Sequence, residues 1–141
     1  MSWLVFATIA GVALAAADFF VKLAAGKLSS SLGLLLYGSC TFLTGLLWVL
    51  GERIRGVPQH IQWAGALAAL GVGVSFSAVT VGLYATFSAG APISIASPFI
   101  RLGGLVLASV AGLLIFREPL TARYVLGMIV AGIGVYLIVT R

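Results

Sequence analysis

The chain has 141 residues, of which 62 % are apolar and only 8 % are charged. A soluble domain has roughly 45–50 % apolar and about 25 % charged residues. This composition therefore excludes a water-soluble enzyme, a nucleic-acid-binding protein and a disordered tail. The net charge of +5 comes from scattered single cations, which mark the ends of membrane spans better than a binding patch.

Polar breaks divide the apolar sequence into five segments, each near the roughly 20 residues that a helical membrane span needs. We expect spans at 3–23, 32–50, 61–87, 93–116 and 122–140, in one membrane domain that covers 1–141. These runs lack the alternation of a membrane barrel, so the sequence predicts an all-α fold with five transmembrane helices. The second span is expected to stop at Gly51, and Thr121 is expected to cap the fifth.

Asp18 is the main polar feature of the first span. A carboxylate in hydrocarbon costs several kcal/mol unless it is paired, protonated or in contact with water. Lys22 lies four residues further on the same helix face, so the two can form an ion pair with the lysine reaching the interface. The alternative places Asp18 in a substrate cavity, where it binds a cation or exchanges a proton.

One-sided polar stripes follow the second and third spans. The second span carries Tyr37, and the third carries Thr80 and Tyr84. Single Ser and Thr residues are common in membrane helices and indicate little by themselves. Polar stripes on several helices together favour a shared interior that forms a solvated path.

Arg101 is the deepest charge. It lies about nine residues into the fourth span, roughly 13 Å from its start at 1.5 Å per residue. Ser97 and Pro98 are helical neighbours on its face, so we expect Arg101 to face other helices. Pro98 is expected to kink the helix, and broken helices at mid-depth hold binding sites in transporters. The sequence predicts either an anion-binding or gating arginine, or a structural one paired with Asp18 or with backbone carbonyls.

Small residues at a spacing of four predict close helix packing in the first, third and fourth spans. The stripes include Gly11 in the first span, Gly65 and Gly73 in the third, and Gly104 in the fourth. The fifth span is apolar all round apart from its glycines, which favours a contact with a second subunit.

The cations are almost evenly divided between the two membrane sides that five spans define. One side has Arg53, Arg55, Arg117 and Arg123, and the other has Lys22, Lys27 and Arg141. Lys and Arg favour the cytoplasmic side, so the bias indicates a cytoplasmic N-terminus, and a near tie also permits insertion in both orientations. The sequence has no metal-ligand spacing, phosphate-binding loop or nucleophile–base pair, so we expect no metal, cofactor or enzyme activity.

Several stretches resemble the EamA-like repeat of the drug/metabolite transporter superfamily. That repeat has five helices, a proline in the fourth, and a glutamate turn before a glycine-rich fifth helix. The matching stretches are 18–22, 83–92, 97–99, 116–121 and 127–135. The chain departs from the pattern at Arg117, where the family usually has glycine, and Arg101 has no assigned place in it.

The resemblance implies membrane transport. Most members carry two inverted repeats and this sequence holds one, so the implied working unit is a dimer that uses alternating access. An antiparallel homodimer and a heterodimer with an oppositely oriented paralogue fit equally, in a bacterial or archaeal inner membrane. A small metabolite or drug would bind along Asp18, Arg101, Tyr84, Thr80, Ser97 and Tyr37. The alternatives are a lipid-linked headgroup flippase, or a subunit of one, and a non-transporting assembly subunit.

Overall fold

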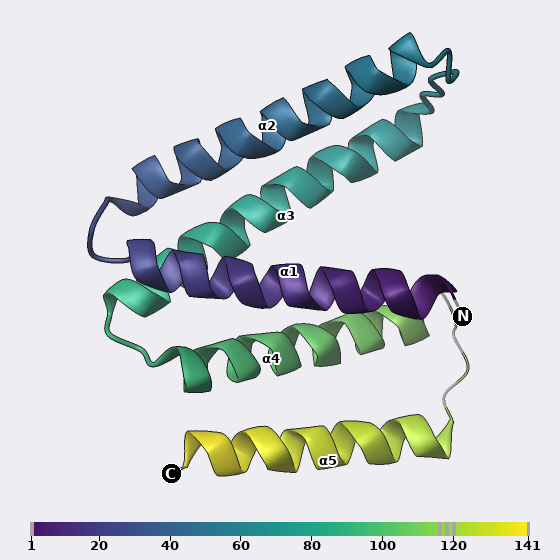
Figure 1. Cartoon of the computed structure of the whole chain (residues 1–141). Helices are drawn as coiled ribbons and strands as arrows, with labels where there is room; N and C mark the ends of the chain where they lie inside the picture. Colours follow the sequence, from purple (N-terminus) through teal and green to yellow (C-terminus); the bar gives the residue numbers. More distant parts are fainter. Residues whose placement is uncertain (1, 116, 118, 120, 141) are drawn as a thin grey trace. The chain divides into compact units, whose positions relative to one another are not determined.

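The computed structural model describes residues 2–115, 117, 119 and 121–140. The helices in this part of the chain are α1 (Ser2–Ala24), α2 (Ser30–Ile54), α3 (Trp63–Ser88), α4 (Ile93–Leu114) and α5 (Ala122–Val139) (Figure 1). All 5 are long and apolar enough to cross a membrane. For the described residues, the predicted all-α class and the prediction of five helices of membrane-spanning length are therefore confirmed.

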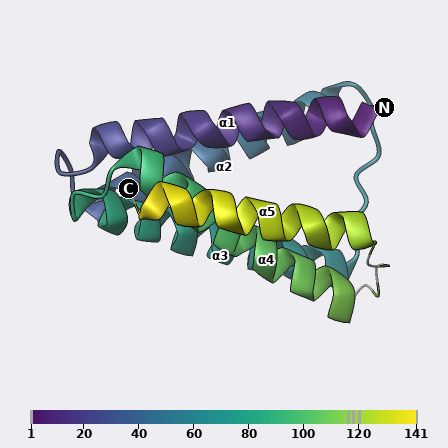
Figure 2. The ribbon, with the colours of Figure 1, turned by 90° about the horizontal axis from the view of Figure 1, so that it is seen from below.

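The helices group into two compact units, Met1–Ala89 and Gly90–Arg141. In the first unit α3 packs against both α1 and α2. The end of α1, the start of α2 and the end of α3 meet at one end of this unit (Figure 1). In the second unit α4 and α5 lie side by side, as Figure 2 also shows.

Hydroxyl caps begin two of the helices. The Ser29 side chain accepts a hydrogen bond from Leu32 N, so α2 begins at Ser30, two residues before the predicted start. The Thr121 side chain likewise accepts from Tyr124 N, which confirms the predicted cap of α5. Each cap satisfies one of the free N–H groups of a first turn.

The end of α2 differs from the prediction. The helix passes through Gly51 and ends at Ile54, because the glycine that stops it is Gly56. Gly56 has a φ of +71° and donates its N–H to Arg53 O, while Val57 N donates to Glu52 O. This pair of bonds is the Schellman motif, which requires a left-handed residue directly after the helix cap.

Arg117 also has a left-handed backbone, with a φ of +52°. Among the described residues it is the one non-glycine with a positive φ, and Gly26, Gly56 and Gly90 have the others. The position is therefore one where glycine would be relaxed and arginine is strained. The helix before it ends at Leu114, and Phe116, the predicted end, lies outside the described residues.

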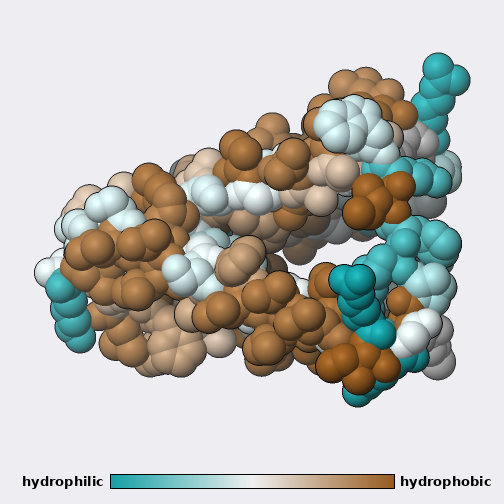
Figure 3. All heavy atoms as spheres, turned by 90° about the horizontal axis from the view of Figure 1, so that it is seen from above, coloured by the Kyte–Doolittle hydropathy of each residue, from teal (hydrophilic) through white to brown (hydrophobic). Residues whose placement is uncertain are grey.

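The helix flanks are covered by apolar side chains. In Figure 3 brown, apolar atoms extend along the helices and teal, polar atoms gather near their ends. No described residue of α5 is buried. This distribution is what helices surrounded by lipid require, since lipid tails accept the side chains that a soluble protein must bury.

Candidate functional site

The buried residues of the first unit gather where its three helices meet. They are Asp18 of α1, Gly33 of α2, and Thr80, Leu83, Tyr84 and Phe87 of α3. The α3 residues are spaced by three and four, so they share one helix face. Three of the predicted site residues, Asp18, Thr80 and Tyr84, therefore fall in one buried cluster.

A tyrosine ring lying on bare backbone joins α2 to α3. A Cβ atom added at Gly33 would lie 2.7 Å from the Tyr84 hydroxyl oxygen and 2.6 Å from its Cε2. Such distances are far below van der Waals contact, so the site admits only glycine without a shift. Within its own unit, no atom lies within 4 Å of the corresponding position at Gly11, Gly65 or Gly73. These three glycines of the predicted stripes thus make no close contact inside this unit.

Asp18 is 3 % exposed, although it belongs to a helix that is otherwise mostly exposed. One turn further along α1, Lys22 places its Nζ 5.5 Å from the centre of the Phe87 ring. A cation over an aromatic face is stabilised by the ring quadrupole, more strongly when water is excluded. This contact joins the last turn of α1 to the last turn of α3. Asp18 lies one turn before Lys22 on the same face of α1.

The hydroxyl stripes of α2 and α3 are satisfied within their own helices. Thr41 donates to Tyr37 O, Thr44 to Cys40 O and Ser77 to Gly73 O, all at 2.8–3.0 Å. Thr80 does the same toward Phe76 O at 2.8 Å. Hydroxyls bonded to the carbonyl four residues back need no water. The stripes therefore do not by themselves require a solvated interior.

Tyr84 differs from these hydroxyl residues. It is 7 % exposed, and no hydrogen bond of its hydroxyl is found among the described residues. Tyr37, one turn after Gly33 on α2, is 39 % exposed and stands outside the buried cluster. The Tyr84 hydroxyl can therefore donate and accept a hydrogen bond within the buried cluster that contains Asp18. Tyr37 lies outside that cluster.

In the second unit the predicted residues lie in the first half of α4. Pro98 lies inside this helix and has no N–H to donate to the carbonyl of Ser94. The Ser97 Oγ is buried and makes no hydrogen bond among the described residues. Arg101 is half-buried one turn further, on the same face as Ser97. This face combines a cation with an unused hydroxyl.

The second unit is held by a polar contact between its helices. The hydroxyls of Ser109 on α4 and Tyr124 on α5 are hydrogen-bonded. Tyr124 therefore links the last turns of α4 to the first turn of α5. A groove of about 540 Å³ lies between the same two helices. It is lined by Phe99, Leu102, Gly103, Val106, Leu107, Gly132, Val135, Tyr136 and Val139.

Sequence reasoning missed Gly33 and Phe87. Both are apolar residues in apolar helices, and only the rotation of α2 and α3 about their axes makes them contacts. Among the described residues, no three His, Cys, Asp or Glu side chains gather to hold a metal ion. Comparisons of the chain with known protein families, with curated proteins and with solved structures found no match.

The Gly33–Tyr84 contact predicts a large difference between two glycines of α2. Gly33→Ala should lower the free energy of unfolding by about 1–3 kcal/mol, because the added methyl overpacks against the ring. Gly38→Ala is the matched control, since open space surrounds Gly38 and alanine favours the helix. Titration with sodium dodecyl sulfate measures both.

A double variant isolates the contact. In a Tyr84→Ala background, Gly33→Ala should have no further destabilising effect, because the ring that it strikes is gone. Equal stability of Gly33→Ala and Gly38→Ala would contradict the contact.

Proposed function

We propose that the protein is a membrane transporter that moves a small metabolite or drug by alternating access. The Asp18 carboxylate carries this proposal, because it is 3 % exposed in a helix of membrane-spanning length. Ionisable groups at such positions mark substrate, ion or proton pathways. Tyr84 adds a hydroxyl group to the same cluster, and Lys22 lies one turn from Asp18 on the same helix.

The second unit supports an anion-binding role for α4. Arg101 and Ser97 share a face, and the Ser97 Oγ is buried without a partner among the described residues. A substrate carboxylate or phosphate could pair with the guanidinium and accept a hydrogen bond from Ser97.

The resemblance to the EamA-like repeat supports transport and suggests the assembly. We propose that a second copy, oppositely oriented, supplies the other half of an inverted-repeat fold in a bacterial or archaeal inner membrane. The near-even division of cations supports dual insertion. No described residue of α5 is buried, so this helix has a free face for a partner. An oppositely oriented paralogue would satisfy the same requirements.

A lipid-linked headgroup flippase is the second candidate. The groove between α4 and α5 is lined by apolar residues such as Leu102, Val106 and Val135. An isoprenoid or acyl chain fits such a surface better than a water-soluble metabolite does. Arg101, on α4 beside Leu102, would then pair with the phosphate of the linkage.

Asp18→Asn should reduce proton-driven uptake of a lipophilic cation, tetraphenylphosphonium, to the level of empty liposomes. The amide keeps the shape of the carboxyl group but cannot exchange a proton or carry a charge. Asp18→Glu should retain part of the uptake. The measurement is uptake into proteoliposomes under an imposed pH gradient, and unchanged uptake by Asp18→Asn would remove Asp18 from the coupling role.

Arg101→Ala should weaken transport of an anionic probe, carboxyfluorescein, about tenfold or more while affecting the lipophilic cation less. A charge-assisted hydrogen bond contributes about 1.5–3 kcal/mol, which corresponds to this range. Arg53→Gln, at the end of α2, is the matched control for loss of a cation. Equal losses for both probes would show that Arg101 supports the fold instead.

The proposed antiparallel homodimer predicts that both orientations occupy the membrane. A cysteine appended to the N-terminus in a Cys40→Ser background should react with an impermeant maleimide from each side in about half of the molecules. Complete labelling from one side would contradict the antiparallel homodimer and favour a paralogue as the partner. Labelling of intact spheroplasts and inverted vesicles gives the two fractions.

A further inference from the structure

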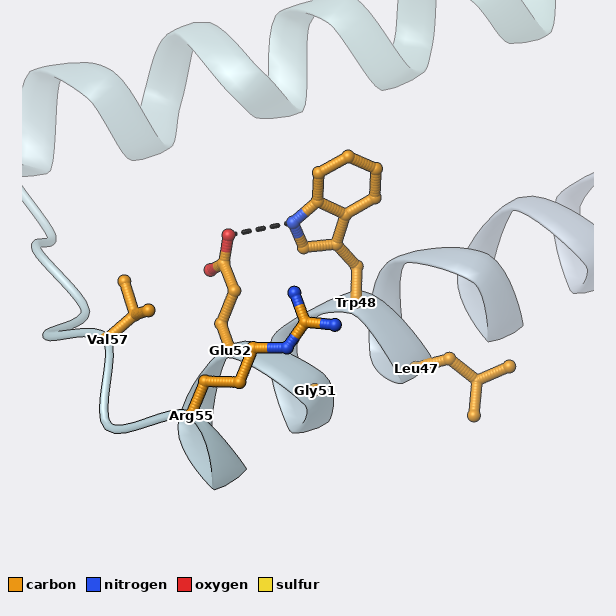
Figure 4. Close-up of a pocket in the computed structure, with 6 residues that line it drawn as sticks. All are labelled: Leu47, Trp48, Gly51, Glu52, Arg55 and Val57. Atoms are coloured by element: carbon orange, nitrogen blue, oxygen red, sulfur yellow. Dashed lines mark hydrogen bonds between the residues drawn. The ribbon is translucent and has the colours of Figure 1, made fainter.

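A pocket with two charged residues in its lining lies at the opposite end of α2 from Gly33. Its volume is about 440 Å³, and it is lined by Leu47, Trp48, Gly51, Glu52, Arg55 and Val57. Figure 4 shows the Trp48 indole, the Glu52 carboxylate and the Arg55 guanidinium on the same side of the helix end. Gly51 has no side chain and open space around it, which leaves room among these three groups.

Two hydrogen bonds orient the Glu52 carboxylate. Trp48 Nε1 donates to Oε1 at 2.7 Å, and Gln59 Nε2 donates to Oε2 at 2.8 Å. An ionised carboxylate has about four acceptor positions, so each oxygen can accept a further donor. Neutral donors therefore hold the carboxylate in place. They do not neutralise its negative charge.

Arg55 brings a positive charge to the same pocket. No hydrogen bond or ion pair of its guanidinium is found in the part of the chain that the structure describes. Its planar fork of N–H donors matches the oxygens of a phosphate. Glu52 and Arg55 thus present opposite charges to one pocket without neutralising each other, which suits a ligand that carries both signs.

The position of the pocket identifies the source of such a ligand. Trp48 lies near the end of a helix of membrane-spanning length, and tryptophan concentrates at the level of the lipid headgroups. Leu47 and Val57 add exposed apolar surface beside the charged groups. The pocket therefore combines headgroup-level charge with a surface for the glycerol and acyl portions of a lipid.

We propose that this pocket binds the headgroup of a zwitterionic phospholipid with a primary amine. The ammonium group donates to Glu52 beside the Trp48 indole, and the phosphate pairs with Arg55. A headgroup without an amine would leave Glu52 beside a phosphate, and a quaternary amine has no N–H to donate. The site is separate from the residues proposed for transport and would anchor the α2 end at a fixed depth.

Native mass spectrometry of the purified full chain, titrated with defined lipids, tests the proposal. The wild type should retain phosphatidylethanolamine more strongly than phosphatidylcholine or phosphatidylglycerol. Glu52→Gln should lower retention of phosphatidylethanolamine about two- to fivefold, the range of an exposed ion pair, and leave phosphatidylglycerol unchanged or higher. Its amide oxygen still accepts from Trp48, so the helix end keeps its hydrogen bond.

Arginine variants provide the matched control. Arg55→Gln should lower retention of all three lipids, whereas Arg53→Gln, which removes the same charge from a residue that does not line the pocket, should not. Equal effects of the two variants would overturn the assignment of the phosphate to Arg55. Equal retention of phosphatidylethanolamine and phosphatidylglycerol by the wild type would overturn the headgroup proposal as a whole.

A soluble analogue distinguishes the lipid from a free phosphoamine. Glycerophosphoethanolamine has the same charged groups without acyl chains, and it should bind much more weakly than the lipid. Binding of equal strength would assign the pocket to a soluble ligand and overturn the lipid proposal. None of these measurements depends on transport, so failure here and failure of the transporter proposal are separate results.

Discussion

Helices in a membrane gain little from apolar contact, because lipid tails are as apolar as leucine. Their association depends on close approach, and in the first unit the Tyr84 ring lying on the backbone at Gly33 provides it. This contact fixes the rotation of α3, so Thr80 and Phe87 face the same way as Tyr84. Phe87 then meets Lys22 of α1, and the buried cluster around Asp18 follows from that alignment.

The apolar runs were sufficient to predict the helices, and local chemistry decided their ends. Thr121 was recognisable as a cap because a hydroxyl precedes an apolar run. Gly51 and Gly56 look alike in sequence, yet only Gly56 takes the left-handed conformation that closes the helix. A Schellman motif depends on bonds from two residues beyond the helix, and those bonds are set by where the following loop turns.

The candidate site was predicted only in part, because some of its contacts depend on how the helices pack. Asp18 stood out because a carboxylate in an apolar membrane helix has a high desolvation free energy. In the structure this residue is buried. The hydroxyl stripes were weaker guides, since residues such as Thr41 and Ser77 bond to their own helix. Gly33 could not be chosen from 18 glycines, because its contact depends on which face of α2 meets α3.

At Arg117, the residue type that the backbone conformation favours differs from the one that the predicted membrane orientation favours. Its left-handed φ of +52° costs an arginine on the order of 1 kcal/mol more than it would cost glycine. In the predicted topology this residue is also one of four cations on one side of the membrane, against three on the other. A glycine at this position would relax the chain and at the same time erase the charge difference that favours one insertion over the other. In that topology, folding stability and the choice of orientation are coupled through a single residue.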